Sequence, residues 1–205
     1  MRWWDIDPVL DLEKAVFPED AWSRGMFWSE LAHARGPEAT RRYLVAEDGD
    51  GRVVGYAGLV CAGEQADVQT IAVARDLWGS GLGARLLTEL LRAATSFECT
   101  EVMLECRVDN TRAQKLYERF GFEPIGFRRG YYQPGNVDAL VMRLNDPARS
   151  LHGAPPDSSA APSGTAEREA ENSESNQKNE NEKNDKSDRN EQSNQNHQNN
   201  EDNDG

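Results

Sequence analysis

The stretch DLWGSGLGARLL, residues 76–87, decides how the fold of this chain is interpreted. It holds three glycines within five residues, directly before a leucine-rich pattern that predicts a helix. A glycine in a helix costs about 0.5–1 kcal/mol relative to alanine, so a compensating role is expected. Free N–H groups at a helix start form an anion site, and glycine lets a phosphate come close to the backbone. The stretch therefore predicts a bound phosphate group, with tight packing of the glycines as the alternative.

Two familiar phosphate loops fit this stretch poorly. A nucleoside-triphosphate loop needs Gly-Lys-Ser/Thr at its end, whereas Ala-Arg follows Gly83. A dinucleotide fingerprint, G-x-G-x-x-G/A, formally fits Gly79, Gly81 and Ala84. In that fold, however, a strand of a parallel sheet runs directly into the first glycine. Here RDLW (75–78) intervenes, and the preceding strands are predicted to be antiparallel hairpins.

The segments before the glycines predict two helices and a sheet. RWWDI (2–6) predicts a short first strand, and residues 8–17 and 24–34 predict two short helices. Three strands are then predicted, joined by tight turns at DGDG and at Gly63-Glu64, over residues 42–47, 52–62 and 65–74. Short turns between neighbouring strands indicate an antiparallel meander.

The segments after the glycines predict alternating helices and strands. A helix begins near Leu82, and a strand at 101–108 shows clean alternation of apolar and polar residues. A helix is predicted at 110–121, with an asparagine at its start and a glycine at its end. FEPIGFRRGYY and VDALVMRL predict two closing strands.

The chain changes character near residue 148. The last aromatic residue is Tyr132, and the last apolar residue larger than alanine is Leu151. The segment 148–205 is mostly Ser, Asn, Gln, Glu, Asp and Lys, and cannot bury enough apolar surface to offset its chain entropy. We expect one folded domain at 1–147 and a disordered, acidic tail at 148–205.

The charge of the chain limits its partners. The tail carries six Lys and Arg against 13 Asp and Glu, and the predicted domain carries 17 against 23, which gives −13 in all. So acidic a chain is a poor candidate for binding the phosphates of a nucleic acid, and it favours a basic protein or peptide. The tail is interpreted as a solubilising extension, with a docking role as the alternative.

The cysteines and the start of the chain bear on its location. Cys61, Cys99 and Cys106 are odd in number and lack metal-ligand spacing, so we expect a reducing, cytoplasmic setting and no metal. The chain shows neither the basic-then-apolar order of a signal peptide nor an apolar run long enough for a membrane span. We expect a cytoplasmic monomer without a membrane partner.

A second group of residues lies in LECRVDNTRAQKLYERFGF, residues 104–122. Glu105 lies on the polar face of a predicted strand, and Tyr117 lies on the apolar stripe of the next helix. A carboxylate and a phenol beside a phosphate-bearing ligand can act as base and acid. Each residue alone also has a plainer interpretation: Glu105 as a solvated residue, Tyr117 as a core residue and Asn110 as a helix cap.

Together these segments resemble a known family. IAVARDLWGSGLGARLLTELL, LECRVDNTRAQKLYERFGFEPIGFRRGYY and DALVMRL resemble the Gcn5-related N-acetyltransferases, and within them the bacterial ribosomal-protein alanine N-acetyltransferases. The resemblance covers residues 1–145 and is densest from 69 to 144. It implies an α/β layered fold, in which helices flank a mixed, mostly antiparallel sheet. It also implies acetyl-CoA as the co-substrate.

The resemblance implies a role for each matching position. The family binds the co-substrate through the backbone of one strand, its pyrophosphate through the glycine loop and its thiol end through an asparagine; the matching residues are Ile71, Ala72, Val73, Gly79, Ser80, Gly81, Leu82, Gly83, Ala84 and Asn110. Glu105 matches the general base and Tyr117 the general acid. Trp78 departs from the family pattern, which has Gln or Arg at this position.

The family's acceptor is the N-terminal alanine of the eighteenth protein of the small ribosomal subunit. Four aromatic residues are candidates to line an acceptor channel, with core packing as the alternative: Trp22, Phe27, Tyr131 and Tyr132. Other protein N-termini, lysines or a small amine remain alternative acceptors. A non-catalytic acyl-CoA sensor and a protein that interacts through its tail remain as different classes.

Overall fold

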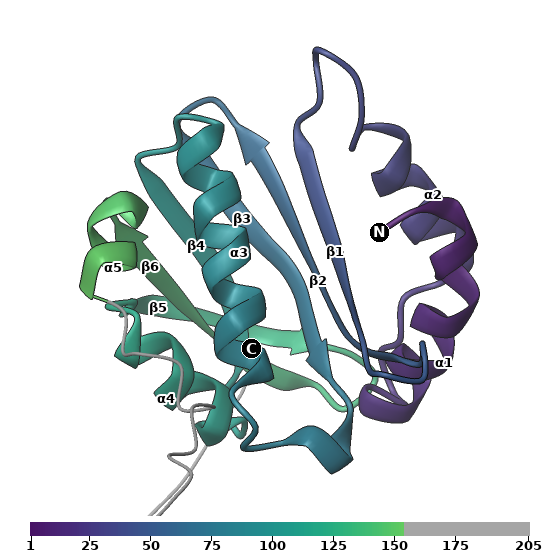
Figure 1. The fold of residues 1–205 in the computed structure, drawn as a ribbon. Helices are drawn as coiled ribbons and strands as arrows, with labels where there is room; N and C mark the ends of the chain where they lie inside the picture. The colour runs from purple at the N-terminus through teal and green to yellow at the C-terminus, as the bar shows by residue number, and fades with distance from the viewer. Residues whose placement is uncertain (154–205) are drawn as a thin grey trace, which may run out of the picture. The chain divides into compact units, whose positions relative to one another are not determined.

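A six-stranded sheet forms the centre of the protein (Figure 1). The computed structural model describes residues 1–153. The strands are β1 (Arg41–Glu47), β2 (Val53–Ala62), β3 (Gln65–Val73), β4 (Glu101–Arg107), β5 (Glu123–Tyr132) and β6 (Val137–Asn145). Their order in the sheet is β1-β2-β3-β4-β6-β5, and only β3 and β4 pair in parallel. The predicted mixed, mostly antiparallel sheet is confirmed.

Helices cover both faces of the sheet. They are α1 (Ile6–Val16), α2 (Arg24–Ala32), α3 (Leu82–Ser96), α4 (Thr111–Arg119) and α5 (Pro147–Gly153). Figure 1 shows α3 crossing one face of the sheet, while α1 and α2 lie beside the other. Each face has its own apolar cluster, one beneath α3 and α4 and one beneath α1 and α2. The sheet is thus packed between two hydrophobic layers, which fix the positions of its strand ends.

Two predictions of local structure are wrong. RWWDI is not a strand: Trp3–Asp5 form a 3-10 turn, and α1 begins at Ile6. The apolar residues from Ile6 onward repeat at helical spacing, and packing of this face buries Ile6 completely. Trp3 and Trp4 stay largely exposed.

The prediction of disorder from residue 148 is wrong for its first few residues. The helix α5 extends through them, Leu151 packs against the cluster beneath α3, and the Ser150 hydroxyl donates to the Phe120 carbonyl at 2.6 Å. The Asp146 carboxylate also accepts from the Arg149 N–H at 3.0 Å, so tertiary and capping contacts together hold this helix. The rest of the predicted tail, 154–205, lies outside the described residues, as does its suggested docking role.

A β-bulge in β3 changes which side chains face each layer. Gly58 of β2 pairs with Thr70 and Leu59 pairs with Val68, so Gln69 is an extra residue in β3. Ala66 and Val68 pack beneath α3 before the bulge, and Ile71 and Val73 do so after it, which reverses the alternation.

The pairing of β3 with β4 ends at the same point. The two strands pair from Gln65 opposite Glu101 to Val68 opposite Leu104, and no further pair is formed. The second half of β3 therefore has no neighbour on its β4 side.

Tyr43 of β1 reaches over Gly58 of β2 and contacts the bulge in β3. Its hydroxyl donates to Gln69 Oε1 at 2.7 Å, and its ring lies over Gly58, its partner on β2. A Cβ added at Gly58 would lie 2.4 Å from the ring atom Cε1. The ring is buried and cannot swing aside without losing the bond to Gln69.

We expect Gly58→Ala to destabilise the protein by about 1–3 kcal/mol, because the new methyl group overpacks the sheet against Tyr43. Urea unfolding followed by circular dichroism measures the change. Gly126→Ala is the matched control, since a Cβ there meets no atom within 4 Å. Equal stabilities of the two variants would contradict the role given to Gly58.

Candidate active site

The parting of β3 and β4 opens a groove of about 1560 Å³. Its walls come from the second half of β3, the end of β4, the glycine loop, α3, α4 and the segment between α1 and α2. Most of the predicted site residues line it: Ile71, Ala72, Val73, Gly79, Gly81, Leu82, Gly83, Ala84, Glu105, Asn110, Tyr117, Trp22 and Tyr132. Ser80, Phe27 and Tyr131 are not among the residues that line it. The fold thus brings residues that are distant in sequence to one groove.

The glycine loop has the geometry that its sequence predicted. Gly79 and Gly81 have φ of 88° and 87°, in the left-handed region that favours glycine. Gly81 is the N-cap of α3 and gives no side-chain bond to the first N–H groups of that helix. Those groups lie at the groove wall, where the helix dipole favours an anion. Ser80 ties the loop together instead, because its hydroxyl donates to the Leu77 carbonyl at 2.7 Å.

The backbone of β3 supplies polar groups to the same groove. The Ala74 N–H donates to the Val54 carbonyl, so by the antiparallel alternation Ala72 also bonds toward β2. Ile71 and Val73 then direct their N–H and C=O groups to the other side, where β4 has parted. One of these groups is already used: the Trp78 indole N–H donates to the Val73 carbonyl at 2.9 Å. The remaining free edge can accept an extended, amide-bearing ligand as a strand would.

The neutral ring of Trp78 holds two arginine side chains beside the glycine loop. The Arg112 guanidinium of α4 stacks 3.3 Å from the centre of its ring, and Arg75 lies 5.2 Å away. Burial, together with the charge of Arg75, lowers the pKa of Arg112. Arg112 therefore brings a positive charge beside the loop, where the family pattern has Gln or Arg at position 78.

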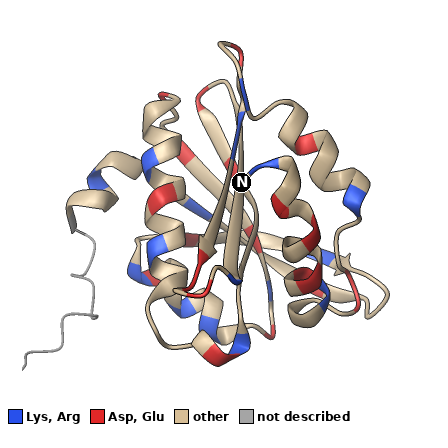
Figure 2. Ribbon diagram, turned by 45° about the vertical axis from the view of Figure 1, so that its right-hand side comes forward, with Lys and Arg blue, Asp and Glu red and all other residues tan. Residues whose placement is uncertain are grey.

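The groove is polarised along its length. The part formed by α3 and α4 is lined by the basic residues Arg85, Arg92, Arg112, Lys115 and Arg119, and the acids that line it there are Glu89 and, just before α4, Asp109. Glu13 and Asp20 line the part near α1. Figure 2 shows basic residues on α3 and α4 and acidic residues along α1. The first part suits a ligand with several phosphates, and the second suits a cation.

Glu105 is a half-buried carboxylate at the end of β4. Its Oε1 lies 2.9 Å from Arg128 Nη1. Burial raises the pKa of Glu105, Arg128 lowers it and Asp67 raises it, with a net rise above the usual value. A carboxylate with a raised pKa is a better proton acceptor near neutral pH.

Tyr117 lies on the other side of β4 from the Glu105 side chain. It packs in the cluster that contains Leu104 and Cys106, is 5% exposed, and lines the groove. Burial raises the pKa of Tyr117, so its phenol stays protonated, as a proton donor requires. Burial also raises the pKa of the Cys106 thiol to about 11, which keeps it neutral and unreactive.

The aromatic candidates divide into two groups. Trp22 and Tyr132 line the groove, and the Tyr132 hydroxyl donates to the Glu105 carbonyl at 3.1 Å. Phe27 is a correction: it packs between Trp22 and Tyr56 and is not among the residues that line the groove, so it supports the wall. Tyr131 is 47% exposed and packs against Tyr132 from outside the groove.

Asn110 has the plainer role that its sequence position allowed, and it also lines the groove. Its side-chain oxygen accepts from the Ala113 N–H at 3.1 Å and so caps α4. The cap fixes the start of the helix that carries Arg112 and Tyr117.

Sequence reasoning missed three residues of this site. Arg128 and Arg112 gave no local signal, because each acts on a residue that is distant in sequence. Glu13 gave a signal that was overlooked: it occupies a position on the apolar stripe of α1, seven residues after Ile6, and it is buried.

Within residues 1–153, no group of three or more His, Cys, Asp and Glu side chains could hold a metal ion. No helix in this range is long and apolar enough to cross a membrane.

Comparisons with known proteins identify the family. The model of the acetyltransferase (GNAT) family matches residues 6–122. The N-alpha-acetyltransferase RimI of Mycobacterium tuberculosis is 38% identical over 144 residues, which cover 68% of this chain and 85% of that protein. The ribosomal protein bS18-alanine N-acetyltransferase of Escherichia coli K12 is 32% identical over 120 residues, covering 57% of this chain and 80% of that protein.

The fold supports the same conclusion. The crystal structure of the ribosomal-protein-S18-alanine N-acetyltransferase from Escherichia coli matches with a TM-score of 0.62 and 26% identity, covering 71% of this chain and 90% of that one. Since the family model spans more than half of the chain, the chain belongs to the GNAT family of acetyltransferases.

Proposed function

We propose that this protein transfers the acetyl group of acetyl-CoA to the N-terminal amine of a protein, and that its acceptor is the N-terminal alanine of ribosomal protein bS18. The observation that carries the proposal is the pairing of a half-buried carboxylate and a buried phenol, Glu105 and Tyr117, on either side of β4 where β3 parts from it. The names of the Mycobacterium tuberculosis and Escherichia coli relatives support the choice of acceptor.

GNAT acetyltransferases use acetyl-CoA as their co-substrate, and the groove fits it. The glycine loop and the start of α3 offer N–H groups for the pyrophosphate, and the basic residues of α3 and α4 surround them. The free edge at Ile71 and Val73 suits the amides of the pantetheine arm. The thioester then lies where the two strands part, near Glu105 and Tyr117.

The reaction follows from the groups at that point. An α-amine has a pKa of about 7.7–8.0 and must lose its proton before it attacks the thioester. Glu105, directly or through water, accepts that proton. The Val73 N–H stabilises the oxyanion, and Tyr117 protonates the leaving thiolate. No covalent intermediate on the enzyme is needed.

The acidic part of the groove suits a positively charged acceptor. We also propose that the enzyme acts as a monomer, and a ribosomal acceptor would place it in the cytoplasm.

Mass spectrometry of acetyl transfer tests the acceptor. One peptide carries a free N-terminal alanine; its match has that terminus blocked and an internal lysine free. We expect acetylation of the first peptide only, because Glu105 serves an amine of low pKa. Acetylation of both peptides would indicate a broader protein acetyltransferase. Acetylation of neither, with coenzyme A bound, would favour a small amine or a non-catalytic sensor.

Tyr117→Phe should lower kcat by about 10²–10⁴-fold, the usual contribution of a general acid, and should leave the KM for acetyl-CoA nearly unchanged. Steady-state kinetics with the free-terminus peptide measure both constants. Cys106→Ala is the control, since it removes the neutral thiol near the same site and should keep most of the activity. An unchanged kcat for Tyr117→Phe would remove this residue from the mechanism.

Arg128→Gln should move the acid limb of the pH profile of kcat/KM to higher pH. Glu105 acts when it is ionised, so the rate falls as the pH falls through its pKa. Loss of the Arg128 charge raises that pKa further. Arg129→Gln, the exposed neighbour, is the control. If the limb stays in place for Arg128→Gln, another group is the base.

A further inference from the structure

Glu13 is a buried acid that the proposed mechanism leaves unused. It is 1% exposed and lies on the face of α1 that packs against the sheet. Its Oε1 accepts a hydrogen bond from the Trp22 backbone N–H at 2.8 Å. Its Oε2 has no hydrogen-bond partner, and among residues 1–153 it is the one buried side-chain polar atom in that condition. A buried carboxylate oxygen without a hydrogen-bond partner is costly, and a donor from a ligand would satisfy it.

The surroundings of Glu13 indicate what kind of donor fits. Glu13, Asp20 and Trp22 all line the groove. Burial raises the pKa of Glu13 to about 7, the Trp22 N–H lowers it, and the charge of Asp20 raises it. Two neighbouring carboxyl groups, one of them buried, favour a cation that can replace lost water.

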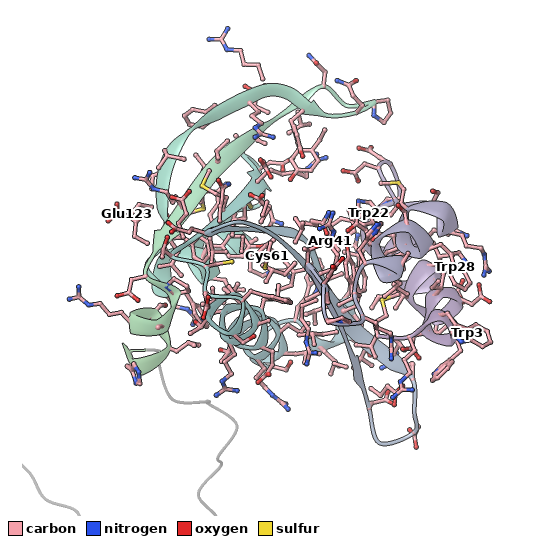
Figure 3. All side chains as sticks on the ribbon, turned by 90° about the horizontal axis from the view of Figure 1, so that it is seen from above. Trp3, Trp22, Trp28, Arg41, Cys61 and Glu123 are labelled. Atoms are coloured by element: carbon pink, nitrogen blue, oxygen red, sulfur yellow. The ribbon has the colours of Figure 1, made fainter. Side chains whose placement is uncertain are left out.

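Asp20 lies within electrostatic range of Tyr132, which contacts the strand of the proposed base. Burial raises the pKa of Tyr132, Asp20 is among the groups that raise it further, and the Tyr132 hydroxyl donates to the Glu105 carbonyl. In Figure 3 Trp22 lies between the N-terminal helices and the sheet, whereas Trp3 and Trp28 point outward. The segment that Glu13 holds through Trp22 therefore borders the acceptor part of the groove.

We propose that Oε2 of Glu13 binds the protonated N-terminal amine of the acceptor as the peptide enters the groove, with Asp20 adding to the negative potential. This inference rests on the proposed function. An ammonium group has three N–H donors, so it can satisfy Oε2 and still bond to a second acceptor. Glu105 then takes the proton when the amine reaches the thioester. The site selects a free, charged terminus over a blocked one.

Calorimetric binding of peptides to the full chain, saturated with coenzyme A, tests the inference without requiring turnover. The free-terminus alanine peptide is compared with the same peptide bearing an N-terminal acetyl group. Glu13→Gln keeps the size of the side chain, and its amide oxygen can still accept the Trp22 N–H. Asp11→Asn, an exposed acid on the same helix, is the matched control.

We expect Glu13→Gln to weaken binding of the free peptide by about tenfold or more, the range for a lost hydrogen bond to a charged group. Binding of the blocked peptide should not change, and Asp11→Asn should behave as the wild type. If Glu13→Gln does not fold, Asp20→Asn tests the same site, and we expect a smaller loss of affinity that is again confined to the free peptide.

Unchanged binding of the free peptide would overturn the inference. So would an equal loss for both peptides, since this would show a purely structural role for Glu13. Failure of the proposed function looks different: the wild type binds the free peptide and loses affinity in Glu13→Gln, yet transfers no acetyl group. A wild type that does not bind the free peptide would remove the ammonium site as well.

Discussion

The end of pairing between β3 and β4 after Val68 and Leu104 is the constraint on which the rest of the structure depends. The extra residue Gln69 reverses the alternation of β3 just beyond this point. Ile71 and Val73 then face the α3 layer with their side chains and direct their backbone groups away from β2. A sheet edge is thus left free inside the molecule, next to a helix start that lacks a side-chain cap. Both features present backbone groups with which a ligand can form hydrogen bonds.

Tyr117 and the Glu105 side chain lie on opposite faces of the sheet. Tyr117 reaches the groove from the α3 and α4 layer, where burial keeps its phenol protonated. Glu105 points from β4 toward the opposite side, where Arg128 and Asp67 adjust its pKa. Because the two side chains are separated by the strand that carries Glu105, each has its own electrostatic environment, as the proposed acid and base require. The groove is also polarised, with basic side chains along α3 and α4 and acidic side chains near α1.

Much of the fold could be predicted from the sequence, because its signals are local. The apolar stripe of α3, the alternation of β4 and the glycines at 79 and 81 each depend on neighbours within a few residues. The prediction failed for RWWDI, where five residues are too few to distinguish a strand from a turn that enters a helix. It also failed at α5, where a polar composition hid the contact made by Leu151.

By itself, the sequence determined the glycine-rich loop before α3, the α/β alternation and the candidacy of Glu105 and Tyr117, because residue type and spacing dictate local conformation. Only the tertiary structure decided which groups meet. It placed Phe27 in the core and Trp22 at the groove. It stacked Arg112 on Trp78 and paired Arg128 with Glu105. It also buried Glu13 with one carboxylate oxygen unpaired. These contacts join segments that are far apart in the chain, and they form only when two apolar layers close on the sheet and fix its strand ends.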